Sequence, residues 1–319
     1  MSHFHQAIAR LIEQINDAKD DDVRFVQILQ EAPPFAPIDW LEAQPIFPKF
    51  YWQSRDTREE VVALGQLYTF SEAEPAYAIL GEDQRVWGGR SFDGHTDKNR
   101  RCLPSFFFLP QIELIRCDGQ WSLAANVTSE RQRSLDALCK LQLEINPLRA
   151  MTSHIKQVIH QPNEVQWQQL VNQALDRIEH QVFKKVVLAR QTTLSLDKPL
   201  SAAQLLKASA EHNHHSFHFL FELDQKHSFM GSTPERLYLR QGQTLYTEAL
   251  AGTIGRGENA SQDMELSHWL TQDSKNLNEN QYVVDDIIER LTPHSDSSDV
   301  EQEVRLIRLR KVQHLSMCD

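Results

Sequence analysis

The 319-residue chain carries 33 basic and 44 acidic residues, so its formal net charge at pH 7 is −11. This acidic balance argues against an electrostatic surface for nucleic acid or for an anionic membrane. It favours a protein whose partner is a small molecule. The cysteines show no CxxC spacing and indicate neither a zinc site nor a disulfide framework; they are Cys102, Cys117, Cys139 and Cys318.

The first twenty residues are expected to form an amphipathic helix, because Phe4, Ile8, Leu11 and Ile15 recur at helical spacing. Polar residues interrupt this segment where a signal peptide needs an unbroken apolar core. No uncharged apolar run reaches the length that a membrane span requires. We therefore expect a cytoplasmic protein.

Residues 22–127 are dominated by short apolar or alternating runs separated by turn residues, and such runs are typical of strands. The clearest hairpin pairs residues 112–117 with 121–127 across Asp118-Gly119, a dipeptide that accepts the positive φ angles of tight turns. The other expected strands are 23–29, 61–68, 77–80 and 106–109. We interpret residues 1–150 as a sheet-rich N-terminal part of one fold.

Residues 151–319 mix helices and strands without a regular βαβ alternation. Asn163 is expected to cap a helix, and a long helical segment at 262–291 is expected to end before Pro293. The remaining expected elements are a strand at 184–196, a helix at 202–210, a strand at 217–223, a hairpin of 236–240 with 244–249, and a strand at 304–309. The pattern predicts an α+β protein with large, mostly antiparallel sheets and helices packed outside.

Two segments combine strand ends with reactive side chains. Lys184 and Lys185 begin the expected strand at 184–196, where period-two alternation sends them to opposite faces, so only one can enter a given cleft. Glu235 follows a tight small-residue segment at 231–234 and can serve there as a general acid. The alternatives are a solvated lysine at a strand edge and a glutamate paired with Arg236 or left in water.

Two further segments offer groups for anions and cations. Residues 247–253 end a strand in a small-residue turn whose backbone N–H groups can contact an anion, although a plain turn explains them equally well. In the helix at 262–291, helical spacing places Asn276, Glu279, Val283 and Asp286 along one stripe. Such oxygen ligands suit Mg²⁺, and a solvated acidic helix face is the alternative.

A cluster of histidines invites a metal interpretation, but period two separates its members and no fixed ligand geometry follows. We interpret this cluster as structural or incidental. Its members are His212, His214, His215 and His218.

Four motifs occur together in one order: Lys-Val-Val-Leu-Ala-Arg at 185–190, Gly-Ser-Thr-Pro-Glu-Arg at 231–236, Glu-Ala-Leu-Ala-Gly-Thr at 248–253 and Lys-Asn-x-x-Glu-Asn at 275–280. Their conjunction resembles the chorismate-utilising enzymes, which include isochorismate synthase, salicylate synthase, anthranilate synthase component I and aminodeoxychorismate synthase. With a lysine in the first motif, at position 185, the sequence resembles the family members that act on water. Three features look most like the menaquinone-pathway isochorismate synthases: the residues at 247–253, Asn280 in the fourth motif, and the segment 47–52. Siderophore-pathway and salicylate-pathway forms are the alternatives.

This resemblance implies a Mg²⁺-dependent isomerisation of chorismate to isochorismate, in which water attacks C2 and the C4 hydroxyl leaves. Lys185 would activate the water and Glu235 would protonate the departing hydroxyl. Gly252 and Thr253 would bind the substrate, and Glu279 would hold Mg²⁺. Residues 151–319 would then form the chorismate-binding catalytic region.

The resemblance also implies that the family continues beyond residue 315. The continuation includes a substrate-binding Pro-Thr-Pro segment, an Arg-Gly-x-Tyr-x-Gly loop and a last helix with a second Mg²⁺ carboxylate, whereas this sequence ends Ser316-Met317-Cys318-Asp319. We therefore expect a fold that is incomplete at the C-terminus and a 319-residue chain of little activity. The alternative is a catalytically dead remnant that at most binds chorismate, metal or a full-length partner.

Overall fold

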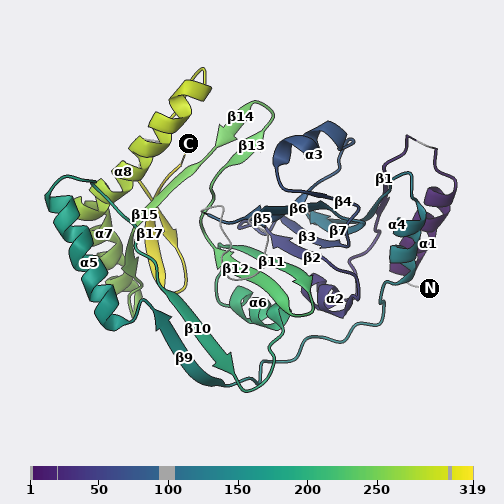
Figure 1. The fold of residues 1–319 in the computed structure, drawn as a ribbon, viewed down its shortest axis with the longest axis horizontal. Coiled ribbons are helices and arrows are strands. Elements are labelled where there is room, and N and C mark those ends of the chain that lie inside the picture. Colours follow the sequence, from purple (N-terminus) through teal and green to yellow (C-terminus); the bar gives the residue numbers. More distant parts are fainter. Residues whose placement is uncertain (1–2, 20, 93–104, 301–303, 319) are drawn as a thin grey trace. The chain divides into compact units, whose positions relative to one another are not determined.

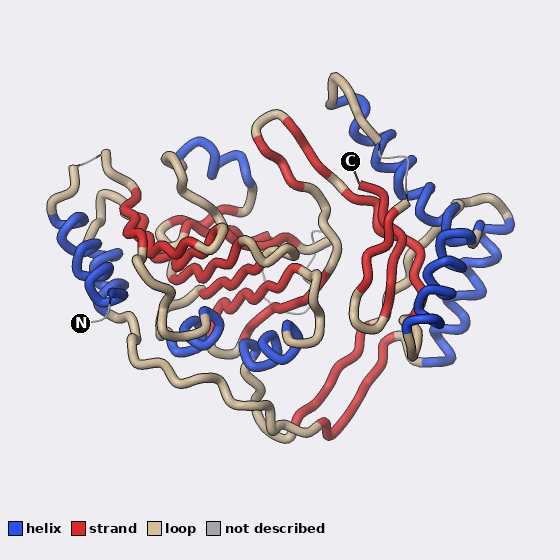
Figure 2. Tube along the Cα trace, turned by 180° about the vertical axis from the view of Figure 1, so that it is seen from behind, coloured by secondary structure: helices blue, strands red, loops and turns tan. Residues whose placement is uncertain are grey.

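The computed structural model describes residues 3–19, 21–92, 105–300 and 304–318. It divides into two compact units, of which the first comprises residues 1–150, 201–212 and 216–234. The second comprises residues 151–200, 213–215 and 235–319. Helices and antiparallel strand pairs make up both units (Figures 1 and 2), which confirms the expected α+β class.

Unit 1 is built on a seven-stranded antiparallel sheet. In spatial order its strands are β1 (Arg24–Ile28), β8 (Gln120–Asn126), β7 (Ile112–Cys117), β3 (Glu59–Leu64), β2 (Lys49–Gln53), β11 (Phe217–Asp224) and β12 (His227–Thr233). The expected hairpin is β7–β8, and Asp118 and Gly119 adopt φ angles of 48° and 84° in its turn. A smaller sheet has the order β4 (Tyr68–Phe70), β6 (Ser105–Leu109), β5 (Trp87–Arg90).

The centre of the large sheet is buried on both faces, as β3 shows, where alternate side chains point to opposite sides of the sheet and nearly all are buried. Val62 and Leu64 enter a core shared with helices. On the other face, Ala63 packs with Phe108 of the small sheet, and Val61 packs in a separate cluster with Ile115. The helices of unit 1 are α1 (His3–Asn16), α2 (Pro37–Ala43), α3 (Ala73–Ile79), α4 (Gln132–Cys139) and α6 (Ala202–Ala210). The expected helices at the N-terminus and at 202–210 are thus confirmed.

The strand expected at 77–80 is wrong, because α3 occupies this segment. Its alternation of Tyr77 and Ile79 does not mark a buried sheet face, since these side chains are 77% and 51% exposed. Ala76 is the buried residue and packs in a small cluster with Leu67 and Leu109. Short apolar runs are ambiguous in this way because strand and helix periods are hard to distinguish over four residues.

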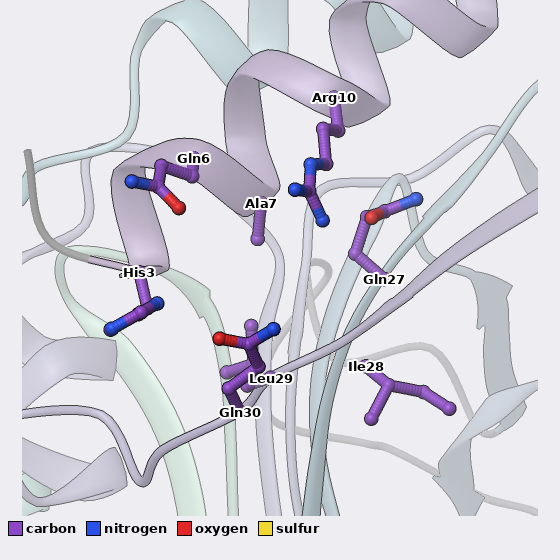
Figure 3. A pocket seen from close by; sticks show the side chains of 8 residues that line it. All are labelled: His3, Gln6, Ala7, Arg10, Gln27, Ile28, Leu29 and Gln30. Carbon is purple, nitrogen blue, oxygen red and sulfur yellow. The ribbon is translucent and has the colours of Figure 1, made fainter.

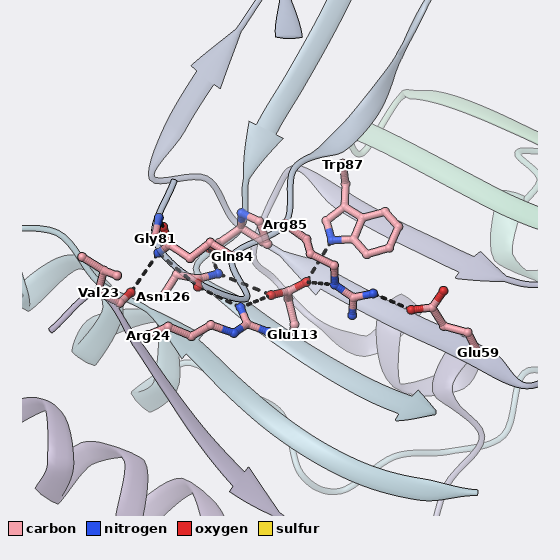
Figure 4. Close-up of polar contacts among 10 residues, drawn as sticks. Val23, Arg24, Glu59, Gly81, Gln84, Arg85, Trp87, Glu113 and Asn126 are labelled. Carbon is pink, nitrogen blue, oxygen red and sulfur yellow. Dashed lines mark hydrogen bonds and ion pairs between the residues drawn. The ribbon is translucent and has the colours of Figure 1, made fainter. Parts of the chain in front are cut away.

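A buried polar network joins the strands of unit 1 (Figure 4). Glu113 of β7 is fully buried and accepts hydrogen bonds from Arg24 of β1 and, at 2.9 Å, from the indole nitrogen of Trp87 in β5. Asn126 of β8 accepts from the same Arg24 guanidinium at 2.8 Å. A buried carboxylate requires such pairing, because the loss of one partner leaves an uncompensated charge in the interior.

The described residues of unit 2 form three separate antiparallel sheets. These are β10 (Gln191–Leu196) with β9 (Ile155–Gln161), β13 (Leu239–Gln241) with β14 (Thr244–Tyr246), and the order β15 (Glu248–Gly255), β17 (Val312–Cys318), β16 (Arg305–Arg308). Its helices are α5 (Glu164–Glu179), α7 (Ala260–Gln272), α8 (Ser274–Leu291) and the short η1 (Thr292–His294). Among the described residues of the whole chain, no helix combines the length and the apolar character that crossing a membrane requires.

The single long helix expected at 262–291 is wrong, because the chain bends at Asp273. This residue has ψ 112°, and its carboxylate accepts a hydrogen bond from the backbone N–H of Asn276 at 2.9 Å. Asp273 therefore ends α7 and caps α8. Aspartate favours this position because its side chain satisfies an N–H group that has no partner within the helix.

Asn163 caps α5 as expected and forms a reciprocal capping box with Gln166. No residue of α5 is buried, and every residue of β9 is exposed. The apolar side chains of these elements, such as Leu175 at 58% exposure and Val158 at 47%, lie on the surface of the described chain. The capping box and the helical spacing of its residues thus specify α5, although none of its side chains is buried in the described chain.

Candidate functional site

Lys185 reaches α8 from an irregular segment. Residues 184–190 form no strand, because β9 pairs only with residues 191–196. The expected strand placement of both lysines is therefore wrong. The Nζ of Lys185 lies 3.6 Å from Oε1 of Glu279, and the Nζ of Lys184 lies 5.8 Å from the ring centre of Tyr282. Glu279 and Tyr282 are three residues apart on α8, so both lysines approach one side of this helix.

The buried stripe of α8 differs from the expected one. Asn276, Asn280 and Val284 are buried, at positions i, i+4 and i+8. Glu279 flanks this stripe, and its side chain is 39% exposed. Asp286 lies on the exposed surface and accepts a hydrogen bond from Arg290 at 2.8 Å. The structure thus separates Glu279, which faces a lysine, from Asp286, which makes a surface ion pair.

Gly252 lies in a β-bulge of β15. The register pairs Leu250 with Ser316 and Thr253 with His314, which leaves two residues of β15 opposite Leu315 alone. Gly252 has φ +86°, and a Cβ at this position would lie 3.0 Å from Cδ1 of Leu315 and 3.2 Å from Cβ of Asn276. The backbone conformation therefore favours glycine, and a Cβ would press on Leu315 and Asn276.

Thr253, the residue after Gly252, contacts His314, and the charge of Glu235 acts on that histidine. Thr253 Oγ1 lies 2.8 Å from Nδ1 of His314 on β17. Burial lowers the pKa of His314, while the charge of Glu235 opposes this change. His314 is therefore in contact with Thr253 and within the electrostatic reach of Glu235. His314 was not among the predicted site residues, because residues 312–318 show no regular alternation of apolar and polar side chains and the sequence pattern assigned no strand to them.

The segment before Glu235 is anchored by hydrogen bonds rather than folded as a tight turn. Residues 231–233 complete β12, and the carbonyl of Pro234 accepts a hydrogen bond from Arg55 at 2.8 Å. The hydroxyl of Ser232 lies 2.8 Å from Nδ1 of buried His218. His218 thus has a structural partner. Arg236 lies 3.4 Å from Oε1 of buried Glu248.

Glu279 is the candidate metal ligand. No group of three His, Cys, Asp or Glu side chains that could hold a metal ion occurs among the described residues. Mg²⁺ often takes only one or two protein carboxylates and completes its coordination with water and substrate oxygens. The partly exposed carboxylate of Glu279 fits that chemistry as a hard oxygen donor.

A pocket in unit 1 contains none of these residues. It lies between α1 and β1, and side chains such as His3, Gln6, Arg10 and Gln27 line it (Figure 3). The lining is mostly polar and carries no carboxylate. The candidate site is therefore the group formed in unit 2 by Lys185, Glu279, the β15 bulge and the residues around His314.

A model of the family described as chorismate binding enzyme matches residues 75–318, which include all four motifs. The chain belongs to this family. It is 35% identical over 294 residues to isochorismate synthase MenF of Escherichia coli, covering 89% of the chain and 66% of that protein. It is also 35% identical to MenF of Haemophilus influenzae, covering 99% of the chain and 72% of the relative.

Solved structures agree with this assignment. The structure of the menaquinone-specific isochorismate synthase MenF from Escherichia coli matches with a TM-score of 0.88 and 32% identity, covering 99% of the chain and 75% of that structure. A DhbC structure from Bacillus anthracis matches with a TM-score of 0.65 at 20% identity, which indicates the fold alone. The chain thus spans about two thirds to three quarters of these MenF proteins. The expected family and its chorismate-utilising fold are confirmed.

Proposed function

We propose that this protein is an isochorismate synthase of menaquinone biosynthesis that acts on chorismate with Mg²⁺. The observation that carries the proposal is the convergence of separate motifs in unit 2. Lys185 lies 3.6 Å from Glu279, and the charge of Glu235 acts on His314, which contacts Thr253. Three MenF relatives at 33–35% identity over 89–99% of the chain favour the menaquinone pathway over a siderophore or salicylate pathway.

In the proposed reaction, water adds at C2 of chorismate, both ring double bonds shift by one position, and the C4 hydroxyl leaves as water. In its neutral form Lys185 takes a proton from the attacking water, and in its protonated form Glu235 gives a proton to the departing hydroxyl, so the net change is an isomerisation. Each proton transfer by a positioned side chain typically contributes about 10²- to 10⁴-fold. Exchange with solvent then restores both side chains.

The substrate would be held by the bulge and by the metal. We propose that Gly252 and Thr253 bind chorismate, with the N–H of Gly252 as one donor. Glu279 would hold Mg²⁺, which when bound supplies positive charge for a carboxylate of chorismate. Residues 151–319 are the proposed catalytic region, and the proposal includes a cytoplasmic location, which rests on the sequence.

The test measures both binding and turnover. Chorismate is titrated into the purified chain with saturating Mg²⁺ by calorimetry, and its conversion to isochorismate is followed by chromatography. Where the wild type converts chorismate, we expect Lys185→Ala and Glu235→Gln to lower turnover by about 10²-fold or more while the fold is retained, with Lys184→Ala as the matched control. Binding without turnover would favour the inactive remnant, and a protein that does not bind chorismate would contradict the proposal.

A further inference from the structure

Asn280 makes contacts that the proposed chemistry does not use. It lies on α8 directly after Glu279, and its side chain is 1% exposed. Its Nδ2 lies 3.0 Å from the carbonyl oxygen of Ala249, 3.1 Å from that of Ala251 and 3.4 Å from that of Leu315. These three acceptors fix the amide orientation, because an amide oxygen in the same place would face only other oxygens.

The carbonyl groups that Asn280 contacts lie at or beside the β-bulge. Carbonyl groups of a regular strand lie in the sheet and pair with the neighbouring strand. At the bulge the ladder between β15 and β17 is interrupted between Leu250 and Thr253. The amide of Asn280 donates to carbonyls of both strands at this interruption, so it supplies hydrogen bonds where the ladder is broken.

Asn280 retains a polar side chain in spite of a cost. Its Oδ1 is buried and has no hydrogen-bond partner among the described residues. An unpaired buried acceptor is destabilising, and an apolar side chain of similar size would avoid it. The N–H donors therefore account for an asparagine at this position. On the preceding helical turn, Asn276 packs against Gly252, so α8 contacts the bulge through both asparagines.

We propose that Asn280 is a positioning residue that holds the bulge at Ala251 and Gly252 in the conformation that binds chorismate. Because Asn280 adjoins Glu279, the same contact keeps the bulge in register with the candidate metal ligand. The inference rests on the proposed function for the identity of the ligand. The effect of Asn280 on the bulge itself can be measured without any ligand.

The experiment observes the backbone amide of Gly252. Ala251-Gly252 is the only Ala-Gly dipeptide in the sequence, so a protein with ¹³C-carbonyl alanine and ¹⁵N-glycine gives one selected NMR signal for this amide. The signal is recorded for the wild type, Asn280→Leu and Asn280→Asp, before and after chorismate and Mg²⁺ are added. Asn278→Leu is the matched control, because it makes the same change at an exposed position of α8.

We expect both Asn280 variants to shift the ligand-free Gly252 signal and to weaken chorismate binding by about tenfold, the loss expected when one backbone hydrogen bond to the ligand is no longer made. The control should change neither. If the two variants do not fold, Asn280→Ser withdraws the amide without added bulk or charge. An unchanged Gly252 signal in a folded Asn280 variant would overturn the inference, as would a shifted signal with unchanged affinity. A wild type that does not bind chorismate contradicts the proposed function, and the ligand-free signals then still decide whether Asn280 holds the bulge.

Discussion

The ion pair of Lys185 with Glu279 predicts that the lysine opposes metal binding. Mg²⁺ must approach a carboxylate that already lies 3.6 Å from an ammonium group. Lys185→Met removes the charge and keeps a side chain of similar length. We therefore expect this variant to bind Mg²⁺ more tightly than the wild type in the absence of chorismate.

The size of the effect follows from distance and exposure. Two unit charges about 4 Å apart interact by about 1 kcal/mol in water and by about 4 kcal/mol at an effective dielectric constant of about 20. The side chains of Lys185 and Glu279 are 25% and 39% exposed, so solvent screens their attraction. Partly exposed pairs contribute about 0.2–1 kcal/mol, which corresponds to a decrease of up to about fivefold in the Kd for Mg²⁺.

The assay is calorimetric titration of Mg²⁺ into the chain at low ionic strength. Lys184→Met is the matched control, since it removes the same charge from a residue that contacts Tyr282 instead of Glu279. Glu279→Gln should abolish binding at this site. Added salt should reduce the difference between Lys185→Met and the wild type, because the Debye length falls to about 3 Å at 1 M. Equal or weaker Mg²⁺ binding by Lys185→Met would refute the reasoning.

Other predictions concern stability. Gly252→Ala should lower the free energy of unfolding by more than Gly242→Ala. Gly242 also has a positive φ, of +61°, but a Cβ there would meet open space. The difference between the two variants in denaturant unfolding is the steric part, about 1–3 kcal/mol. The hydrogen bond from the side chain of Arg256 lowers the pKa of Asp263 from 3.8 to about 2. Its stabilising contribution is therefore complete above about pH 4 and disappears as the pH falls toward 2, so thermal unfolding of Asp263→Asn should match the wild type only near pH 2. Leu175→Ala on exposed α5 should change stability by less than about 0.5 kcal/mol in urea, whereas Leu206→Ala in the core should cost about 2–5 kcal/mol.

Local signals in the sequence predicted local structure well. Asn163 caps α5, and Asp118-Gly119 forms the turn of β7–β8, because each depends on residues only a few positions apart. The break at Asp273 carried a comparable signal, since Asp-Ser before a helical run is typical of an N-cap. The apolar residues keep a helical spacing through 262–291, so the break between α7 and α8 could not be recognised from periodicity.

Long-range pairing could not be predicted in the same way. β11 pairs with β2, which is far away in the sequence, and β17 inserts between β15 and β16. The motifs supplied the candidate residues of the site. The contact of His314 with Thr253 depends instead on a strand pair that joins residues 61 positions apart, and no local pattern specifies it.

The site combines firmly held groups with one loosely held group. Gly252, Thr253 and His314 belong to paired strands, and Asn280 ties these strands to the helix that carries Glu279. Lys185 belongs to no ladder, and its ion pair with Glu279 is partly exposed to solvent. Loss of Glu279 therefore removes both a candidate metal ligand and the contact that orients the lysine. A drop in activity on that substitution alone cannot be assigned to the metal, and the separate titration of Lys185→Met is the measurement that distinguishes the two effects.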